Sequence, residues 1–506
     1  MSQQHLDRLS SVDAGFLHQE DGRDSHMHIG GIGIFEGPAP DEQSLLDHIG
    51  SRLKLVPRFR QKLVAAPLSS GRPMWADDVR FNLNYHVRRT ALPRPGNELQ
   101  LRRLISRVHS QRLDRTKPLW EMWIVEGLAD DRWAVLTKTH HALVDGVGGI
   151  DIMTALLDLS PESREVGPDD WRAAREPGFV DLVGRGVSGA ARNITEVGGK
   201  LLGRAFAPRQ TAAEAVERVL GLADMARMTL SPAPPTPLNR TPGPHRDFAF
   251  VREPIAEAKA IKDALGGTLN DVVLAVVSGA LRRFLDDLGC PVDSMRLRAC
   301  VPMSVRTSEQ ASASGNRIVI MVAELPIDIA DPVARLHQVS EHMTGLKSSR
   351  QAVAAETMIQ MEQWMPPNVL AQATRLGFSS RLYNLLVTNV PGPQFPVYLL
   401  GRRMLEVFPI AFLAPEHTLA VAILSYDGSL SMGLLSDADA DHDLPGLVGY
   451  IDDAVTELLD AAGITRETPA EPPASAGRGQ RTATARKASP RKTSPRKAGG
   501  RAGRRP

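Results

Sequence analysis

Two periodicities of hydrophobic and polar residues divide the first 160 residues into predicted helices and strands. Residues 101–113 place apolar side chains at helical spacing, which predicts an amphipathic helix. Residues 75–87 alternate apolar and polar side chains, and Trp133–Thr137 is apolar and β-branched, so both segments are predicted to be strands. Helical spacing returns over residues 146–157. This mixture predicts an α/β domain over residues 1–160.

The same mixture recurs between residues 246 and 465. Gly266 and Gly267 end a short helix, and Thr268 begins another with Asp271 three residues later, the spacing of a capping box. Asp427-Gly428 lies between two apolar segments and predicts a β-hairpin. The other predicted elements are strands over 296–301, 318–325 and 385–393, and helices over 255–265, 331–348 and 447–459. This pattern predicts a second α/β domain over residues 246–465.

The segment between these domains, residues 161–245, has a different pattern. Apolar residues recur at near-helical spacing over 179–206, with arginines and glycines among them. Two structures fit this pattern: a linker helix packed across the two halves of the chain, which we favour, and a helix lying in a membrane interface. The proline-rich segment 231–237 then ends the linker, because proline cannot continue regular structure.

The composition is that of a globular protein, with 42% hydrophobic and 23% charged residues in 506. The amino-terminal residues lack the apolar segment of a signal peptide. The longest apolar run, Val272–Leu281, is too short to span a bilayer and is followed by two arginines. The only cysteines, Cys290 and Cys300, do not make a disulfide framework. We therefore expect a cytoplasmic protein.

The net charge of +2 conceals a strong asymmetry along the chain. Residues 478–506 contain 11 lysines and arginines and no acidic residue, a formal charge of +11. Residues 1–477 therefore have a formal net charge of −9. The tail, residues 466–506, has few apolar residues to bury and is predicted to be disordered. Three interpretations stay open for it: a solubilising segment without a partner, attraction to anionic lipid headgroups, and binding of nucleic-acid phosphates.

The candidate chemistry lies in Thr137–Gly149, where His140 and His141 end a predicted strand and Asp145 begins the following helix. Adjacent strand residues face opposite sides, so only one of the two imidazoles is expected to face a given cavity. Imidazole titrates near neutral pH and suits a general base. Half of a zinc site is an alternative, but no further ligand lies nearby at the usual spacing. Spacing alone leaves a catalytic and a structural interpretation open.

Residues 140–146, His-His-Ala-Leu-Val-Asp-Gly, match the His-His-x-x-x-Asp-Gly motif of the coenzyme-A-dependent acyltransferase and condensation-domain superfamily. Further motifs narrow this resemblance, namely Ser11–Phe16, Pro118–Glu121, Asn270–Ala275 and Val387–Pro393. With them, residues 5–462 resemble the bacterial wax ester synthase / acyl-CoA:diacylglycerol acyltransferase family, which includes mycobacterial triacylglycerol synthases. The tail beyond is not covered.

The resemblance implies two chloramphenicol-acetyltransferase-like mixed-sheet domains with a helical linker, a shared channel and a disordered basic tail. It implies a catalytic set of His141 as the base, His140, and Asp145, which would hold the motif loop through an arginine such as Arg306. It also implies a set of substrate-binding residues, namely Gly146, Asn270, Asp271, Thr388 and Asn389. Asn270 is the candidate donor to an oxyanion, Asp271 fits a helix cap equally well, and His28 fits either the channel wall or a plain strand position.

The activity that the resemblance implies is direct transfer of a long-chain acyl group from acyl-CoA to diacylglycerol, with long-chain alcohols as further acceptors. Acyl-CoA is then a substrate, and no cofactor or metal is expected. The implied partners are acyl-CoA, a lipid alcohol, and the surface of the inner membrane or of lipid droplets. The alternatives are a condensation-type enzyme with a carrier-protein donor, a non-enzymatic lipid-surface protein, and nucleic-acid binding by the tail as an accessory function.

Overall fold

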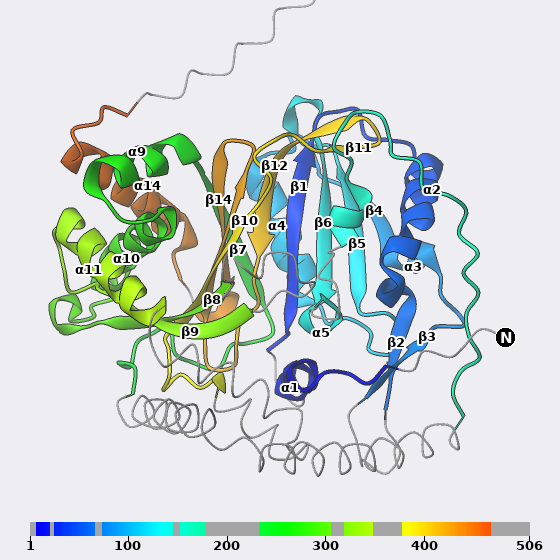
Figure 1. Ribbon diagram of the computed structural model, residues 1–506, viewed down its shortest axis with the longest axis horizontal. Helices are drawn as coiled ribbons and strands as arrows, with labels where there is room; N and C mark the ends of the chain where they lie inside the picture. The colour runs from blue at the N-terminus through cyan, green and yellow to red at the C-terminus, as the bar shows by residue number, and fades with distance from the viewer. Residues whose placement is uncertain are drawn as a thin grey trace, which may run out of the picture. The chain divides into compact units, whose positions relative to one another are not determined.

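The computed structural model describes residues 7–20, 25–65, 73–144, 152–178, 232–304, 318–347, 377–440 and 442–466. The described residues up to Thr465 form one compact unit with two six-stranded sheets and one two-stranded sheet. Helices pack against both large sheets, so the fold is mixed α/β, as the sequence predicts (Figure 1). The predicted helix over 179–206 and the tail beyond residue 466 lie outside the described residues.

The first large sheet is built around the apolar strand that precedes the two histidines. β6 (Trp133–His140) is buried along its whole length, because its alternate residues enter two separate apolar clusters on the two faces of the sheet. β6 pairs antiparallel with β1 (His28–Phe35), which places His28 opposite His140. The strand order is β11–β12–β1–β6–β5–β4, completed by β5 (Trp120–Glu126), β4 (Val87–Ala91), β12 (Arg402–Ile410) and β11 (Tyr398–Leu399).

The second large sheet has the order β7–β14–β13–β10–β8–β9. Its strands are β7 (Arg246–Pro254), β14 (Ser429–Asp437), β13 (Leu419–Tyr426), β10 (Leu385–Pro391), β8 (Leu297–Ser304) and β9 (Ile318–Leu325). β10 runs parallel to β13 and β8, and the other pairs are antiparallel. The predicted hairpin joins β13 to β14 through Asp427 and Gly428, both with positive φ as such a turn requires.

Four helices bury the apolar face of this second sheet: α9 (Ile255–Leu265), α10 (Leu269–Asp287), α11 (Pro332–Lys347) and α14 (Leu444–Ala461). In Figure 1 they form a layer on one side of β7 to β9. α10 lies at the centre of that layer, and most of its residues are buried. No single helix in the described ranges is long and apolar enough to span a bilayer; α9 and α10 meet that test only as a pair, bent by 101°.

One part of the second half of the chain joins the first sheet. β12 pairs antiparallel with β1 through Gly30↔Ile410 to Phe35↔Met404, and β11 pairs with β12 beyond it. The segment 398–410, which the sequence analysis assigned to the 246–465 domain, is therefore part of the first sheet. Periodicity reports which face of a strand is buried but not which sheet accepts the strand, so this pairing was not predictable from the pattern.

The prediction of one strand over residues 75–87 is wrong. β3 (Met74–Asp77), a turn, α3 (Leu83–His86) and the start of β4 occupy this segment. Phe81 stacks on His86 with ring centroids 5.3 Å apart, and Trp120 stacks on it at 4.6 Å. The alternating aromatic residues thus pack around a buried histidine in a helical turn. Trp120 and Leu119 are fully buried and belong to the core of the first half.

The remaining elements complete the first half of the fold. The helices are α1 (Ser11–Glu20), α2 (Glu42–Arg52), α4 (Glu98–Ser110), α5 (His141–Val144) and α6 (Ile152–Leu156), and β2 (Gln61–Val64) pairs with β3. Short 3-10 turns lie at Leu53–Leu55, Pro57–Arg60, Ala129–Asp131, Val292–Ser294 and Ala438–Ala440. α4 covers one face of the first sheet, and α1 lies beside α5 at the end of β6 (Figure 1).

Candidate active site

The two adjacent histidines lie where β6 ends and α5 begins. His140 is the last residue of the strand, and its N–H donates to Leu119 O over 3.0 Å. His141 is the first residue of α5, and its N–H donates to Met27 O over 2.8 Å. These two backbone contacts fix the chain at the point where it changes from strand to helix. His140 is 1% exposed, whereas His141 is only half-buried.

Both ring nitrogens of His140 have a partner. Nδ1 accepts the N–H of Ala142 over 3.0 Å, so the ring proton lies on Nε2. Nε2 in turn lies 3.1 Å from Oε1 of the buried Glu20. An imidazole held on both sides supports the local structure and cannot also take a proton from a substrate. His140 is therefore placed to support the backbone beside His141.

The ring of His141 lies among aromatic side chains from both halves of the chain. Phe16 of α1 has its ring centroid 4.1 Å from the imidazole, and Phe412 packs edge-on at 5.6 Å. Phe378 contacts both phenylalanines, at 5.6 and 6.1 Å between ring centroids. We call these three rings the aromatic box: Phe16 and Phe412 contact the imidazole, and Phe378 packs against both of them. Phe378 and Phe412 come from the second half, so side chains of both halves meet beside His141.

Glu20 is a buried carboxylate beside the histidine pair that the sequence analysis did not find. It is 7% exposed; Oε1 accepts the Met27 N–H over 2.6 Å, and Oε2 accepts from Arg115 over 2.8 Å. Burial alone would raise the pKa of this carboxyl, but His140, Arg115 and the Met27 N–H outweigh it and lower the pKa to about 2. Glu20 is therefore charged at any physiological pH. The one sequence signal was its position four residues after Phe16, on the same helix face.

A further group of buried basic residues lies on the α4 face of the first sheet. Lys138 Nζ donates to Val108 O over 3.0 Å and Gln111 O over 2.7 Å at the carboxyl end of α4, where a positive charge is favourable. Burial lowers the pKa of Lys138 to about 8 and, helped by the Lys138 charge, that of His109 to about 3. His28 is buried beside them, 3.9 Å from Glu20 Oε1 through Nε2.

Among the predicted substrate-binding residues of the second half, Asn270 and Asn389 contact each other, whereas Asp271 belongs to a helix cap. Asn389 Nδ2 on β10 donates to Asn270 Oδ1 on α10 over 3.1 Å, which leaves the Asn270 Nδ2 amide as the group able to donate. Thr388 precedes Asn389 on the same strand. The structure does not join Asn270 or Asn389 to His141 by a hydrogen bond within the part of the chain that it describes.

Asp271 has a structural role. Its Oδ2 accepts the Thr268 N–H over 2.8 Å and the Ser340 hydroxyl over 3.1 Å, while its own N–H donates to Thr268 Oγ1 over 3.2 Å. These contacts complete the capping box that the sequence predicted at the start of α10. The carboxylate is 2% exposed. The geometry therefore favours the helix-cap interpretation of Asp271 over substrate binding.

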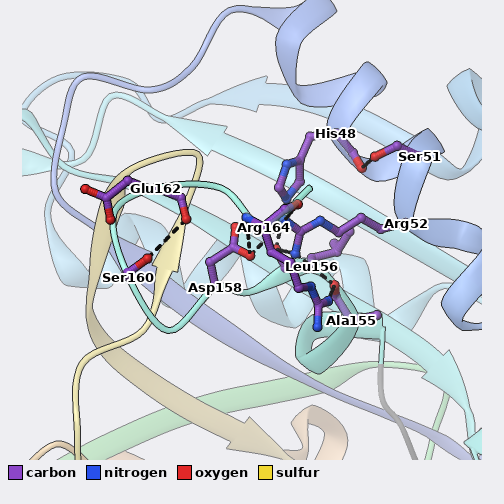
Figure 2. Close-up of polar contacts among 9 residues, drawn as sticks. All are labelled: His48, Ser51, Arg52, Ala155, Leu156, Asp158, Ser160, Glu162 and Arg164. Carbon is purple, nitrogen blue, oxygen red and sulfur yellow. Dashed lines mark hydrogen bonds and ion pairs between the residues drawn. The ribbon is translucent and has the colours of Figure 1, made fainter. Parts of the chain in front are cut away.

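Asp145, Gly146 and the candidate partner Arg306 lie outside the described residues. The chain on either side of 145–151 is described, and a polar network fixes its downstream side (Figure 2). Arg52 of α2, 1% exposed, donates from Nη2 to both carboxylate oxygens of Asp158 over 2.8 and 2.9 Å. Its Nη1 donates to the carbonyls of Ala155 and Leu156, which end α6. α6 is thereby anchored to α2.

Within the described ranges, no group of three or more histidine, cysteine, aspartate or glutamate side chains could hold a metal ion. Glu20, His28 and His140 lie together, but the closest His28–Glu20 contact is 3.9 Å and His140 Nδ1 already accepts a backbone N–H. What the described site offers chemically is one half-buried imidazole in an apolar setting, supported by a second imidazole and a charged carboxylate. This arrangement suits proton transfer.

The chain is similar to known acyltransferases over most of its length. Residues 9–273 match the wax ester synthase/diacylglycerol acyltransferase catalytic domain, and residues 314–459 match the C-terminal domain of the same family. The chain is 34% identical over 459 residues to the probable diacylglycerol O-acyltransferase tgs1 of Mycobacterium tuberculosis, covering 90% of this chain and 96% of that protein. It is 32% identical over 471 residues to the putative diacylglycerol O-acyltransferase Rv3740c of the same species, covering 90% and 100%.

Solved structures show the same fold. The wax ester synthase/diacylglycerol acyltransferase of Marinobacter aquaeolei VT8 superposes with a TM-score of 0.62 at 25% identity, over 90% of this chain and 100% of that one. The starter condensation domain of rhizomide synthetase RzmA superposes at 0.56 with 14% identity, over 90% and 94%, a likeness of fold alone. From the two matched domains, the relatives and the shared fold, we conclude that this chain belongs to the wax ester synthase/diacylglycerol acyltransferase family.

Proposed function

We propose that this protein is an acyl-CoA-dependent O-acyltransferase that moves a long-chain acyl group to diacylglycerol and also accepts long-chain alcohols. Membership of the family and the names of its mycobacterial relatives support this reaction class. The observation that carries the proposal is the different treatment of the two histidines. His140 is buried, with Nδ1 accepting a backbone N–H and Nε2 lying 3.1 Å from the Glu20 carboxylate, whereas His141 is half-buried beside the rings of Phe16 and Phe412.

In the proposed reaction, His141 takes the proton from the acceptor hydroxyl while its oxygen attacks the thioester carbonyl carbon. A tetrahedral intermediate forms, the carbon–sulfur bond then breaks, and the leaving coenzyme A thiolate receives the proton from His141. General-base catalysis of this kind contributes about 10²- to 10⁴-fold, or about 3 to 5 kcal/mol of barrier. No electron transfer or resident cofactor is needed, because acyl-CoA supplies the activated acyl group.

Stabilisation of the oxyanion intermediate requires a hydrogen-bond donor. We assign Asn270 Nδ2 to this role, because Asn389 already donates to the Asn270 oxygen and so directs the amide nitrogen away from that contact. We also propose that the protein acts at the inner face of the membrane or at lipid droplets, since diacylglycerol is insoluble in water. The basic tail, if it binds anionic headgroups, would assist this contact.

The test uses purified protein, radiolabelled palmitoyl-CoA, and diolein or hexadecanol offered separately. His141→Ala is expected to lose transfer by at least about 100-fold with an unchanged circular dichroism spectrum. His337→Ala, which alters an exposed histidine on α11, is the matched control and should keep full activity. Label in triacylglycerol with wild type supports the proposal, and label in wax ester alone would change the acceptor. Transfer by His141→Ala at the wild-type rate would exclude it as the base.

The main competing function is a condensation-type reaction that uses a carrier-protein thioester as donor. Its fold is the same, as the likeness to the RzmA condensation domain illustrates. A palmitoyl-loaded carrier protein offered in place of palmitoyl-CoA separates the two. Folded protein that uses the carrier-bound acyl group and ignores palmitoyl-CoA would overturn the proposal.

A further inference from the structure

Glu20 makes contacts that converge on the chain around His141. It lies at the carboxyl end of α1 and is buried. Its carboxylate accepts the Met27 N–H and a hydrogen bond from Arg115, and it lies 3.1 Å from His140 Nε2. Two of these partners are distant along the chain: Arg115 is 95 residues and His140 is 120 residues from Glu20. The carboxylate therefore ties α1 to the end of β6.

The first connection to His141 runs through the ring of His140. Ala142, the residue after His141, donates its N–H to His140 Nδ1 over 3.0 Å. Nδ1 can accept only while the ring proton stays on Nε2, and the charged Glu20 opposite Nε2 favours that tautomer. A carboxylate that fixes the tautomer and orientation of a histidine acts through that histidine on the group it supports.

The second connection runs through the backbone of Met27. Its N–H donates to Glu20 Oε1, and its carbonyl accepts the His141 N–H over 2.8 Å. The peptide groups before and after the His141 side chain are therefore both joined to the same carboxylate, one through Met27 and the other through His140 and Ala142. Displacement of Glu20 would loosen both at once.

The third connection runs along α1. Phe16 lies one turn before Glu20 on this helix, and its ring is 4.1 Å from the His141 ring. Arg115 Nη2 binds both Glu20 Oε2 and the carbonyl of Leu17, so the helix end is fixed together with the carboxylate. Glu20 thus also fixes the position of Phe16, one of the three rings of the aromatic box.

We propose that Glu20 is a positioning residue for His141: it fixes the tautomer of His140 and the backbone on both sides of His141, and so keeps that imidazole aimed at the substrate. This inference rests on the proposed function of His141 as the base. Glu20 itself need not touch the substrate, because both of its carboxylate oxygens already have partners in Met27, Arg115 and His140.

The kinetic test compares Glu20→Gln and Glu20→Asp with wild type in the acyl-transfer assay. Glu20→Gln can keep the Met27 contact but carries no charge, so kcat is expected to fall about 10- to 100-fold with KM changed less than about 2-fold. Glu20→Asp retains the charge on a shorter side chain and should recover part of kcat. Asp437→Asn is the matched control, a buried carboxylate on β14 that accepts the N–H groups of Gly243 and Asp439; it should keep wild-type kcat.

A second measurement needs no substrate and so separates this inference from the proposed function. Protein with ¹⁵N-labelled histidine is compared by NMR with Glu20→Gln, and the His140 signal is identified from its loss in His140→Gln. We expect the Nε2–H tautomer in wild type and a mixture of tautomers in Glu20→Gln. An unchanged His140 tautomer, or a folded Glu20→Gln enzyme with wild-type kcat, would overturn the inference. Absence of acyl transfer by wild type would overturn only the proposed function.

Discussion

At the scale of single residues, the two adjacent histidines of the motif have different surroundings. His140 is buried against Glu20, whereas His141 is half-buried beside aromatic rings. Strand alternation predicts that only one of His140 and His141 faces a given cavity, and which of them acts as the base stays a prediction. It could not predict the contacts of Glu20, because contacts with residues about 100 positions away along the chain produce no periodic pattern in the sequence. α1 offers no amphipathic pattern either, since its residues are almost all buried. The histidine motif is visible in the sequence, whereas the contacts of Glu20 become visible only in the fold.

Buried histidines give the chain an expected sensitivity to acid. Burial lowers the pKa of His26 to about 4, that of His109 to about 3, and that of His28 well below its ordinary value. In the unfolded chain each histidine takes up a proton below about pH 6.5, whereas the folded chain excludes it. The free energy of unfolding therefore falls as the pH falls from about 6.5 toward 4, by about 1.4 kcal/mol per pH unit for each histidine.

His109→Leu tests this expectation. The side chain faces Lys138, Arg246 and His26, all of which oppose a positive charge on the ring. Urea unfolding at pH 7 and pH 5 should show a loss of stability that is smaller in the variant than in wild type by about 2 kcal/mol. Equal losses in both proteins would mean that His109 is protonated in the folded state.

At the scale of helices and strands, predictions succeeded where the signal is local. The capping box at Thr268, the glycines that end α9 and the Asp427-Gly428 turn all lie within a few residues of the boundaries that they determine. The prediction of a strand over residues 75–87 was wrong because aromatic residues also alternate with polar ones where the aromatic rings surround one side chain, here His86. Local signals therefore predict where elements begin and end, and packing decides between alternating patterns.

The start of α10 offers a test of which residue binds substrate and which caps the helix. Thr268→Ala and Asp271→Asn each remove part of the capping box and should lower the free energy of unfolding by about 1 kcal/mol. Asn270→Ala should leave stability within about 0.5 kcal/mol and lower kcat by about 10²-fold. Urea unfolding together with the acyl-transfer assay checks both. An Asn270→Ala enzyme with full kcat would remove this residue from the oxyanion site.

The ion pair between α2 and the segment after α6 is expected to be a major local stabiliser. Arg52 and Asp158 are both almost fully buried, so Arg52→Met leaves an uncompensated carboxylate and should cost about 3 to 5 kcal/mol of unfolding free energy. Lys62→Met, which breaks the surface pair with Glu176, is the control and should cost no more than about 1 kcal/mol.

The double variant Arg52→Met/Asp158→Leu removes both charges and should recover most of the stability lost by the single change. A single variant as stable as wild type would show that the pair does not anchor α6.

At the scale of the whole molecule, the two halves are one structure. β12 of the second half lies against β1, and Phe378 and Phe412 form two sides of the aromatic box. We predict that residues 1–245 expressed alone aggregate, because β1 then presents an unpaired edge. Co-expression with residues 246–506 should yield a soluble complex by size-exclusion chromatography. A soluble, cooperatively unfolding 1–245 fragment would contradict this prediction.

The crossing of β12 into the first sheet has a consequence for synthesis on the ribosome. β1 and β6 are complete when residue 140 emerges, but the strand that closes their open edge ends at Ile410. At about 5 to 20 residues per second, the roughly 270 intervening residues take on the order of 15 to 50 seconds to translate. Throughout that interval the edge of β1 that later pairs with β12 stays unpaired. The nascent chain is therefore a natural client for chaperones that shield exposed strand edges, until the late-made strand arrives.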